Sequence, residues 1–204
     1  PHVGTDRLHI TLIELRKRLL SLGADIRFGH RLEKLETEDG GLRAIAVSGP
    51  EGAYTLPARQ LVLALGHSAR DTVEQLYDQG LSMVAKPFAV GVRIEHLQSR
   101  MDAVQYKEYA GHPALPVSSY KLSCHLPDGR GVFSFCVCPG GQVVAAASEP
   151  RRTVTNGMSE YARSGENING GLLVSVTPED FGSGHPLAGI AFQRRLEEAA
   201  YRLG

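Results

Sequence analysis

The sequence lacks the glycine-rich fingerprint of dinucleotide-binding domains. The chain has 204 residues and 23 glycines, but these never fall as G-x-G-x-x-G. That spacing, between a strand and a helix, lets backbone amides approach a pyrophosphate. The chain also opens on proline instead of an initiator methionine. We therefore expect it to be a piece of a longer protein.

Three further absences narrow the class of protein. Lys plus Arg and Asp plus Glu number 22 each, so no excess of charge points to nucleic acid or to an acidic membrane surface. No apolar stretch approaches the roughly 20 residues that cross a bilayer. The cysteines number three, an odd count that suits a reducing compartment. The sequence favours a cytoplasmic protein that binds neither nucleic acid nor membrane.

The first 80 residues have an α/β pattern. Leucines spaced by four and three predict a helix over residues 6–22, capped by Thr5 or Asp6 and ended by Gly23. Short strands are expected at residues 25–28 and 53–56, and a hairpin at residues 31–47. Residues 61–65 are apolar on both faces, which is typical of a buried parallel strand. A tight turn and a helix over residues 70–79 follow, and Gly80 ends that helix.

After Gly80 the pattern becomes antiparallel with helices, so we place a boundary between regions 1–80 and 81–204. Strands are expected at residues 89–95, 120–124, 132–137, 142–147 and 172–176, and helices at residues 97–106 and 188–203. The turn at residues 127–131 joins two of the strands. The fold class is therefore mixed α/β and α+β.

The turn Gly66-His67-Ser68 admits several interpretations. A nucleophile elbow would need glycine two residues after the serine, where this chain has Arg70. A plain strand-to-helix turn with Ser68 as the helix cap is the simplest interpretation. The turn could instead approach a cofactor, with Arg70 near a phosphate or in solvent.

Cysteine chemistry is a second candidate. Cys136 and Cys138 lie two positions apart on an expected strand, so their thiols share a face. Cys124 and His125 lie on the opposite strand of a hairpin, and the four side chains could together bind a zinc ion. The spacing is not C-x-x-C, and burial as small apolar side chains is the simpler interpretation. Cys138 begins Cys138-Pro139-Gly140-Gly141, where little side-chain bulk lets the backbone pass close to another chain segment or a flat ring.

A third candidate is the polar segment Asn156-Gly157-Met158. Amide side chains and exposed backbone suit the polar edge of a heterocycle. An ordinary Asn-Gly turn is the competing interpretation. Among the eight histidines, His96 follows Glu95 at the end of an expected strand and is a weaker acid/base candidate.

Several segments, taken in order, match one family over nearly the whole chain. They are residues 1–8, 62–72, 86–96, 120–122, 131–141, 147–149, 154–159 and 186–190. The chain resembles an uncharacterised family of FAD-dependent dehydrogenases of bacteria and plastids, related to glutathione-reductase-like flavoproteins.

This resemblance implies that the first region belongs to a Rossmann-like FAD domain and the second to an antiparallel substrate-side domain. It implies that Gly66, His67 and Ser68 approach the phosphate or ribose of FAD. The isoalloxazine would face two further sets of residues, Cys138, Pro139, Gly140 and Gly141 and then Asn156, Gly157 and Met158.

Cys138 is our first catalytic candidate, and we expect no metal. The parent protein would bind FAD and a small-molecule substrate of unknown identity. Because the phosphate-binding glycines are missing, we expect this chain to bind FAD weakly or not at all and to be inactive alone. Residues 61–65 should be exposed and could support a dimer. The alternative is a binding module with no cofactor, which presents the same loops to a peptide or protein.

Overall fold

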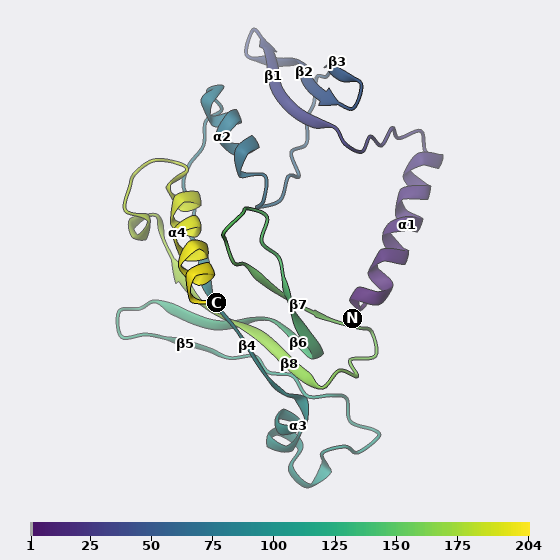
Figure 1. Ribbon diagram of the computed structural model, residues 1–204, viewed down its shortest axis with the longest axis vertical. Helices are drawn as coiled ribbons and strands as arrows, with labels where there is room; N and C mark the ends of the chain where they lie inside the picture. Colours follow the sequence, from purple (N-terminus) through teal and green to yellow (C-terminus); the bar gives the residue numbers. More distant parts are fainter. Residues whose placement is uncertain (1) are drawn as a thin grey trace.

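The computed structural model describes residues 2–204 and shows a mixed α/β chain with antiparallel sheets and helices, as expected (Figure 1). A small sheet of three strands and a larger sheet of five strands are joined by the segment that carries helix α2. The two sheets lie on either side of residue 80, although the boundary there stays a prediction. In the described residues, no helix is both long and apolar enough to cross a membrane.

Helix α1 (Thr5–Ser21) confirms the leucine pattern. Neither Thr5 nor Asp6 caps it, because the cap position falls on Gly4 and the Asp6 carboxylate instead accepts a hydrogen bond from the Tyr161 amide at 2.7 Å. Gly23 ends the helix in the left-handed conformation with φ +88°, as predicted. None of the α1 side chains is buried, so its leucine face has no covering element within the described chain.

The small sheet confirms the predicted hairpin. Strands β1 (Arg31–Glu38), β2 (Gly41–Gly49) and β3 (Gly52–Pro57) pair antiparallel in chain order. Asp39 and Gly40 form the first turn, and both have positive φ. The strand predicted at residues 25–28 is wrong, since this segment pairs with no other strand and runs as an extended link and turn.

The strand predicted at residues 61–65 is also wrong. The segment has no strand partner among residues 2–204, and a strand needs one to satisfy its backbone groups. Its expected exposure is confirmed, because Val62 is 88% exposed and Leu63 and Leu65 are also exposed. Helix α2 (Arg70–Asp78) follows as predicted and ends at Gly80, with φ +87°.

The larger sheet has the order β4-β8-β6-β5, and β7 pairs with the far end of β6. Its strands are β4 (Phe88–Leu97), β5 (Ser123–His125), β6 (Gly131–Ala145), β7 (Thr155–Ser159) and β8 (Asn167–Val176). All pairings are antiparallel. The two strands predicted at residues 132–137 and 142–147 are one long strand, β6, which bends at two irregularities between Phe135 and Gly141.

Helices follow both ends of this sheet, because β4 and β8 run antiparallel. Helix α3 (Gln98–Tyr106) and the short η1 (Lys107–Tyr109) follow β4, while η2 (Pro178–Phe181) and α4 (Ala188–Leu203) follow β8. The main apolar core lies here: Val176, Phe181 and Ala188 are buried and pack against Phe88 and Phe192. The Phe88 and Phe181 rings stack with centroids 5.0 Å apart.

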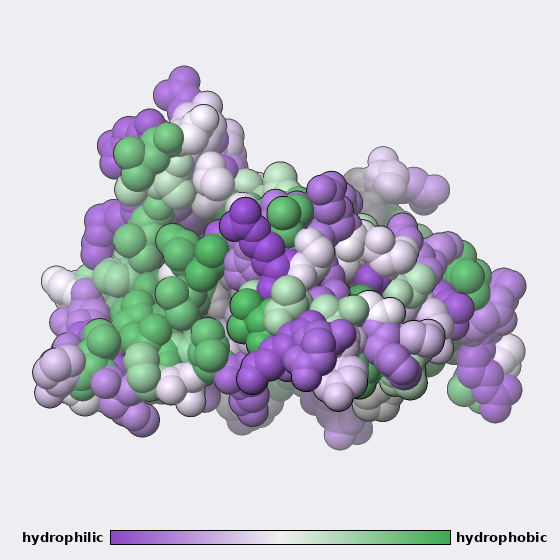
Figure 2. Space-filling model, turned by 90° about the horizontal axis from the view of Figure 1, so that it is seen from below, coloured by the Kyte–Doolittle hydropathy of each residue, from purple (hydrophilic) through white to green (hydrophobic). Residues whose placement is uncertain are grey.

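The rest of the sheet is only partly covered. Figure 2 shows apolar side chains gathered at the β5 side of the molecule when it is seen from below. Register places Val92 beside Leu172, and Leu172 beside Ser134 of β6. Val92 and Leu172 are both exposed. An exposed apolar surface is therefore available on this sheet to a ligand or a further chain segment.

Candidate functional site

The bulged part of β6 is the centre of the candidate site. Between Phe135 and Gly141 the register with β8 shifts twice, so that Cys138 pairs with Asn169 and Gly141 with Asn167. Cys136 and Gly140 both have positive φ, at 48° and 55°. Such bulges re-aim side chains and are frequent near functional sites.

The bulge separates the two neighbouring cysteines. Cys138 is buried, as expected, whereas Cys136 is exposed, so the expected burial of Cys136 is wrong. The Cys138 thiol donates a hydrogen bond to the Cys136 carbonyl at 3.4 Å. Burial raises the pKa of Cys138, so its thiol stays protonated at neutral pH. Its catalytic role stays a prediction.

The glycines of this segment pack against another stretch of chain. The Gly140 amide donates to Gln98 Oε1 at 2.9 Å, and its carbonyl accepts from the Gly165 amide at 3.1 Å. A Cβ at Gly140 would overlap the Arg163 carbonyl, and one at Gly141 would overlap the Met158 carbonyl. Close approach of backbone, which the sequence predicted here, is made by the chain itself. Pro139 is buried within the same bend.

A polar hollow of about 380 Å³ opens beside these glycines. Of the residues predicted to bind the cofactor, it brings together Gly140 and Gly141 from β6 and Met158 from β7. The remaining lining residues are Gln142, Ser159, Glu160, Ser164, Gly165, Glu166 and Asn167. The lining is polar and includes several glycines that expose backbone groups.

The segment of Asn156, Gly157 and Met158 forms β7, so the Asn-Gly turn is wrong. Asn156 is exposed and pairs with Val144. Gly157 lies against the centre of the sheet, where a Cβ would overlap both Asn169 Oδ1 and Arg93 Nη1. The glycine is therefore required for this arginine and asparagine to occupy their places.

Gly66, His67 and Ser68 do not line the polar hollow. They form an exposed turn in which Gly66 has φ +68°. Ser68 does not cap α2, because the cap position is Ala69 and no side chain bonds there. His67 lines a second hollow, between β4 and α4. The predicted contact of these three residues with FAD stays a prediction.

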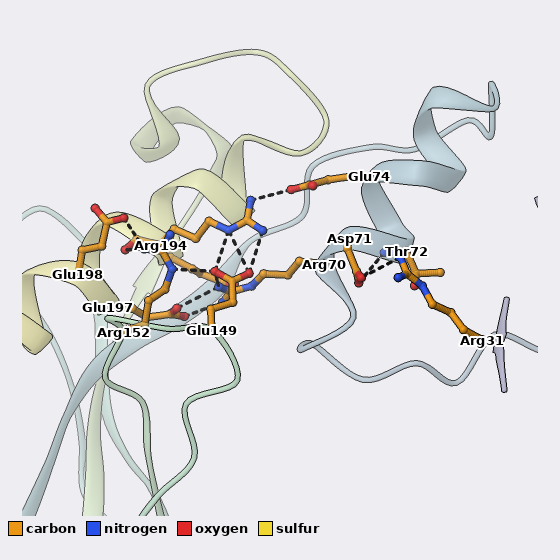
Figure 3. Close-up of polar contacts among 11 residues, drawn as sticks. Arg31, Arg70, Asp71, Thr72, Glu74, Glu149, Arg152, Arg194, Glu197 and Glu198 are labelled. Carbon is orange, nitrogen blue, oxygen red and sulfur yellow. Dashed lines mark hydrogen bonds and ion pairs between the residues drawn. The ribbon is translucent and has the colours of Figure 1, made fainter. Parts of the chain in front are cut away.

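Arg70, predicted near a phosphate or in solvent, is buried in an ion-pair network (Figure 3). Its guanidinium binds both carboxylate oxygens of Glu197 on α4, at 2.5 and 2.9 Å. Glu149 accepts from Arg194 and Arg152, and Arg194 also reaches Glu74 on α2. The hydrogen bonds from Arg194 are the main reason that the pKa of Glu149 falls to about 2. The network joins α2 and the loop after β6 to α4.

Sequence reasoning missed a group of buried polar side chains around β4 and β8. Four buried side-chain atoms have no hydrogen-bond partner among residues 2–204: Arg93 Nε, His96 Nε2, the Tyr120 hydroxyl oxygen and Asn169 Nδ2. Asn169 is completely buried. The register of β4 and β8 places Arg93 and Asn169 on one face of the sheet and His96 on the other. The centroid of the His96 ring lies 5.6 Å from the centroid of the Tyr120 ring. Buried polar atoms without partners are rare in folded proteins, and each calls for an explanation. Alternation along β4 could have indicated that Arg93 faces the same side as Ala89 and Gly91.

The zinc alternative finds no support in the structure. Across residues 2–204, no group of three or more His, Cys, Asp or Glu side chains is placed to hold a metal ion. Cys124 pairs with Val132 at the β5–β6 edge and is exposed, like Cys136.

Comparison with known proteins identifies the family. An uncharacterized protein of Clostridium beijerinckii (strain ATCC 51743 / NCIMB 8052) is 47% identical over all 204 residues. The chain spans 38% of the length of that relative. Residues 87–204, which form the five-stranded sheet with α3 and α4, match the model of a domain family. The chain belongs to the family described as FAD-dependent protein, C-terminal domain-like.

Proposed function

We propose that the chain is part of a longer FAD-dependent oxidoreductase, a dehydrogenase of the glutathione-reductase-like type, and that it forms one side of the flavin and substrate pocket. The family match and the chain's 38% share of its relative's length support this proposal. The observation that carries it is the hollow shared by Gly140 and Gly141 of β6 and Met158 of β7. These are residues that the resemblance assigns to the isoalloxazine.

In this proposal the flavin supplies the hydride or electron transfer when it is bound. The chain's own residues hold and orient the ring. Backbone groups at Gly140 and Gly141 border the hollow, and the Gln98 side chain fixes the Gly140 amide by accepting its hydrogen bond. Gln142 and Ser159 add polar groups to its lining. Cys138 lies within the bent part of β6 as a protonated thiol, and we retain it as the catalytic candidate.

The alternative function is a binding module that presents the same loops to a peptide or protein without a cofactor. A closed, polar surface at the two segments would favour that function. The hollow is instead concave and is lined by both segments, which favours the flavin pocket. The structure offers no observation that specifically favours a peptide.

The proposal is tested by the flavin content of the longer protein that carries this chain. Purified protein should be yellow, and its absorbance spectrum should show bound flavin in equimolar amount. Released cofactor should be FAD on chromatography, and not FMN or riboflavin. A colourless protein that takes up no flavin on incubation with FAD would contradict the proposal. The alternative module would give that result.

A further inference from the structure

A second cavity lies between β4, the segment that leads into β7, and α4. Its volume is about 440 Å³, within the range of small-molecule sites. Apolar residues make up much of its lining: Val143, Val154, Leu196 and Ala200, together with residues 89–92 of β4. The polar side chains are fewer, and Arg93 and His67 are the cationic or potentially cationic groups among them.

Arg93 is held rigidly in this wall. Its Nη1 donates to Asn169 Oδ1 at 2.6 Å and to the Cys136 carbonyl at 3.1 Å. Asn169 is itself completely buried, and Gly157 leaves the space that the guanidinium occupies. The bulge at Cys136 turns that carbonyl toward Arg93. Three separate strands therefore fix the position of one half-buried cation.

No protein anion neutralises this cation. In the part of the chain that the structure describes, no carboxylate lies within 4.0 Å of Arg93, whereas the neighbouring Arg70 and Arg194 each bind carboxylates. Glu197 also lines the cavity, but both of its oxygens are bound to Arg70. Half-buried arginines are normally paired, because an uncompensated charge is costly to desolvate.

The hydrogen-bonding edge of Arg93 is also incomplete. Its Nε is buried and has no acceptor among residues 2–204, and its Nη2 makes no hydrogen bond within the described chain. The buried Nε is closed to solvent and therefore also to a ligand atom in the cavity. The Nη2 group is the donor that the described chain leaves free, and its charged N–H groups can donate to a carboxylate oxygen.

We propose that this cavity binds a small carboxylic acid with an apolar body, and that Arg93 holds the carboxylate. The apolar residues of the cavity contact the body of the ligand. The free Nη2 group of Arg93 donates hydrogen bonds to the ligand carboxylate. This site is separate from the hollow at Gly140 and Gly141, since the two share no lining residue. Binding at this cavity can therefore be tested on this chain without FAD.

The test is an equilibrium titration of the purified protein with benzoate, followed by calorimetry or by ligand-observed NMR. Benzamide has nearly the same shape without the charge, and inorganic phosphate has charge without the apolar body. We expect benzoate to bind about tenfold or more tightly than either, since a charge-assisted hydrogen bond and the apolar burial each contribute at least 1.4 kcal/mol, or tenfold. Equal binding of phosphate and benzoate would overturn the assignment to a carboxylic acid.

Two variants locate the site. Arg93→Gln should weaken benzoate binding by about tenfold or more while benzamide binding is unchanged. Leu196→Trp should block the cavity and remove binding of benzoate while Arg93 stays in place. Arg100→Gln, which removes an exposed charge on α3, is the matched control and should bind as the unmodified protein does.

Thermal unfolding of each variant shows whether it remains folded. If Arg93→Gln is too unstable to titrate, Leu196→Trp and salt dependence of benzoate binding still decide the matter. Unchanged binding in a folded Leu196→Trp variant would overturn the proposal, because the ligand would then lie elsewhere. Binding that is lost equally in Arg100→Gln would also overturn it, since the effect would be one of net charge.

Discussion

Replacing Glu149 with glutamine should strongly destabilise the protein at neutral pH. The Glu149 side chain is 21% exposed and accepts hydrogen bonds from Arg194 at 2.8 Å and from Arg152 at 2.7 Å. Buried Arg70 lies 3.5 Å away. Glutamine keeps the shape of the side chain but brings no charge to these three guanidinium groups. Both carboxylate oxygens of Glu149 accept hydrogen bonds from arginines, whereas a glutamine side chain has one oxygen acceptor and one NH₂ donor.

The magnitude follows from proton affinity. Arg194 and the other two arginines lower the pKa of Glu149 from 4.5 to about 2, against the opposing effect of burial. Since each tenfold change in proton affinity corresponds to about 1.36 kcal/mol, the charged form stabilises the folded protein by roughly 3 kcal/mol at pH 7. That is a large fraction of the roughly 5–15 kcal/mol by which a typical domain is stable.

The sign of the pH dependence is fixed by the same shift. The folded pKa is below the unfolded one, so the stabilisation is complete well above pH 4.5 and is lost as the pH falls toward about 2. By pH 3.5 this group alone should have lost about 1.4 kcal/mol of its contribution. The Glu149→Gln variant lacks this group, so its stability should fall less steeply over the same interval.

Urea unfolding at pH 7 and pH 3.5, followed by circular dichroism, measures both effects. Glu108→Gln is the matched control, because Glu108 is exposed and has no ion pair in the described chain. A Glu149→Gln variant as stable as this control at pH 7, with the same dependence on pH, would refute the reasoning. The network of Figure 3 would then contribute nothing measurable to the packing of α4.

Three further results are expected. Gly157→Ala should cost about 1–3 kcal/mol in thermal or urea unfolding, because its Cβ would overlap Arg93 and Asn169; a variant of unchanged stability would show that this region repacks freely. Phe181→Ala should cost about 3–5 kcal/mol, since that ring is 2% exposed at the centre of the core; a loss below 1 kcal/mol would contradict the assigned core. With a thiol reagent at neutral pH, two of the three cysteines should react quickly and Cys138 only after unfolding, because it is buried and its pKa is raised; rapid labelling of all three in the folded protein would contradict its burial.

Elements whose signals are local could be predicted from the sequence. The leucine spacing of α1, the Asp39–Gly40 turn between β1 and β2, and the glycine ends of α1 and α2 each depend on residues close together in the chain. Such patterns encode their own structure through side-chain periodicity and backbone preference.

The strands that failed show the limit of local patterns. Residues 25–28 and 61–65 have strand-like composition, but no described strand lies beside either, and alternation alone does not supply a partner. The segment Pro139-Gly140-Gly141 predicted an interruption between two strands. In the structure β6 continues through this segment, with two irregularities in its register with β8. The backbone groups of this stretch are satisfied from elsewhere, as when the Gly140 amide donates to Gln98.

The candidate sites depend on long-range register in the same way. Arg93 and Asn169 lie 76 positions apart and meet only because β4 pairs with β8. The sequence could not reveal that Arg93 lacks a carboxylate, since this depends on Glu197 being bound to Arg70 from a third element. By contrast, the small residues Gly140 and Gly141 correctly predicted a place where the backbone is approached closely.

The central claim is that this chain forms a wall of a flavin pocket but lacks the loop that grips the FAD pyrophosphate. Titration of this chain with FAD, followed by flavin fluorescence, tests that claim most directly. We predict weak binding or none on the isolated chain, with no saturation at micromolar concentration. Saturable binding of sub-micromolar affinity would contradict it, because the missing amides could not then be essential.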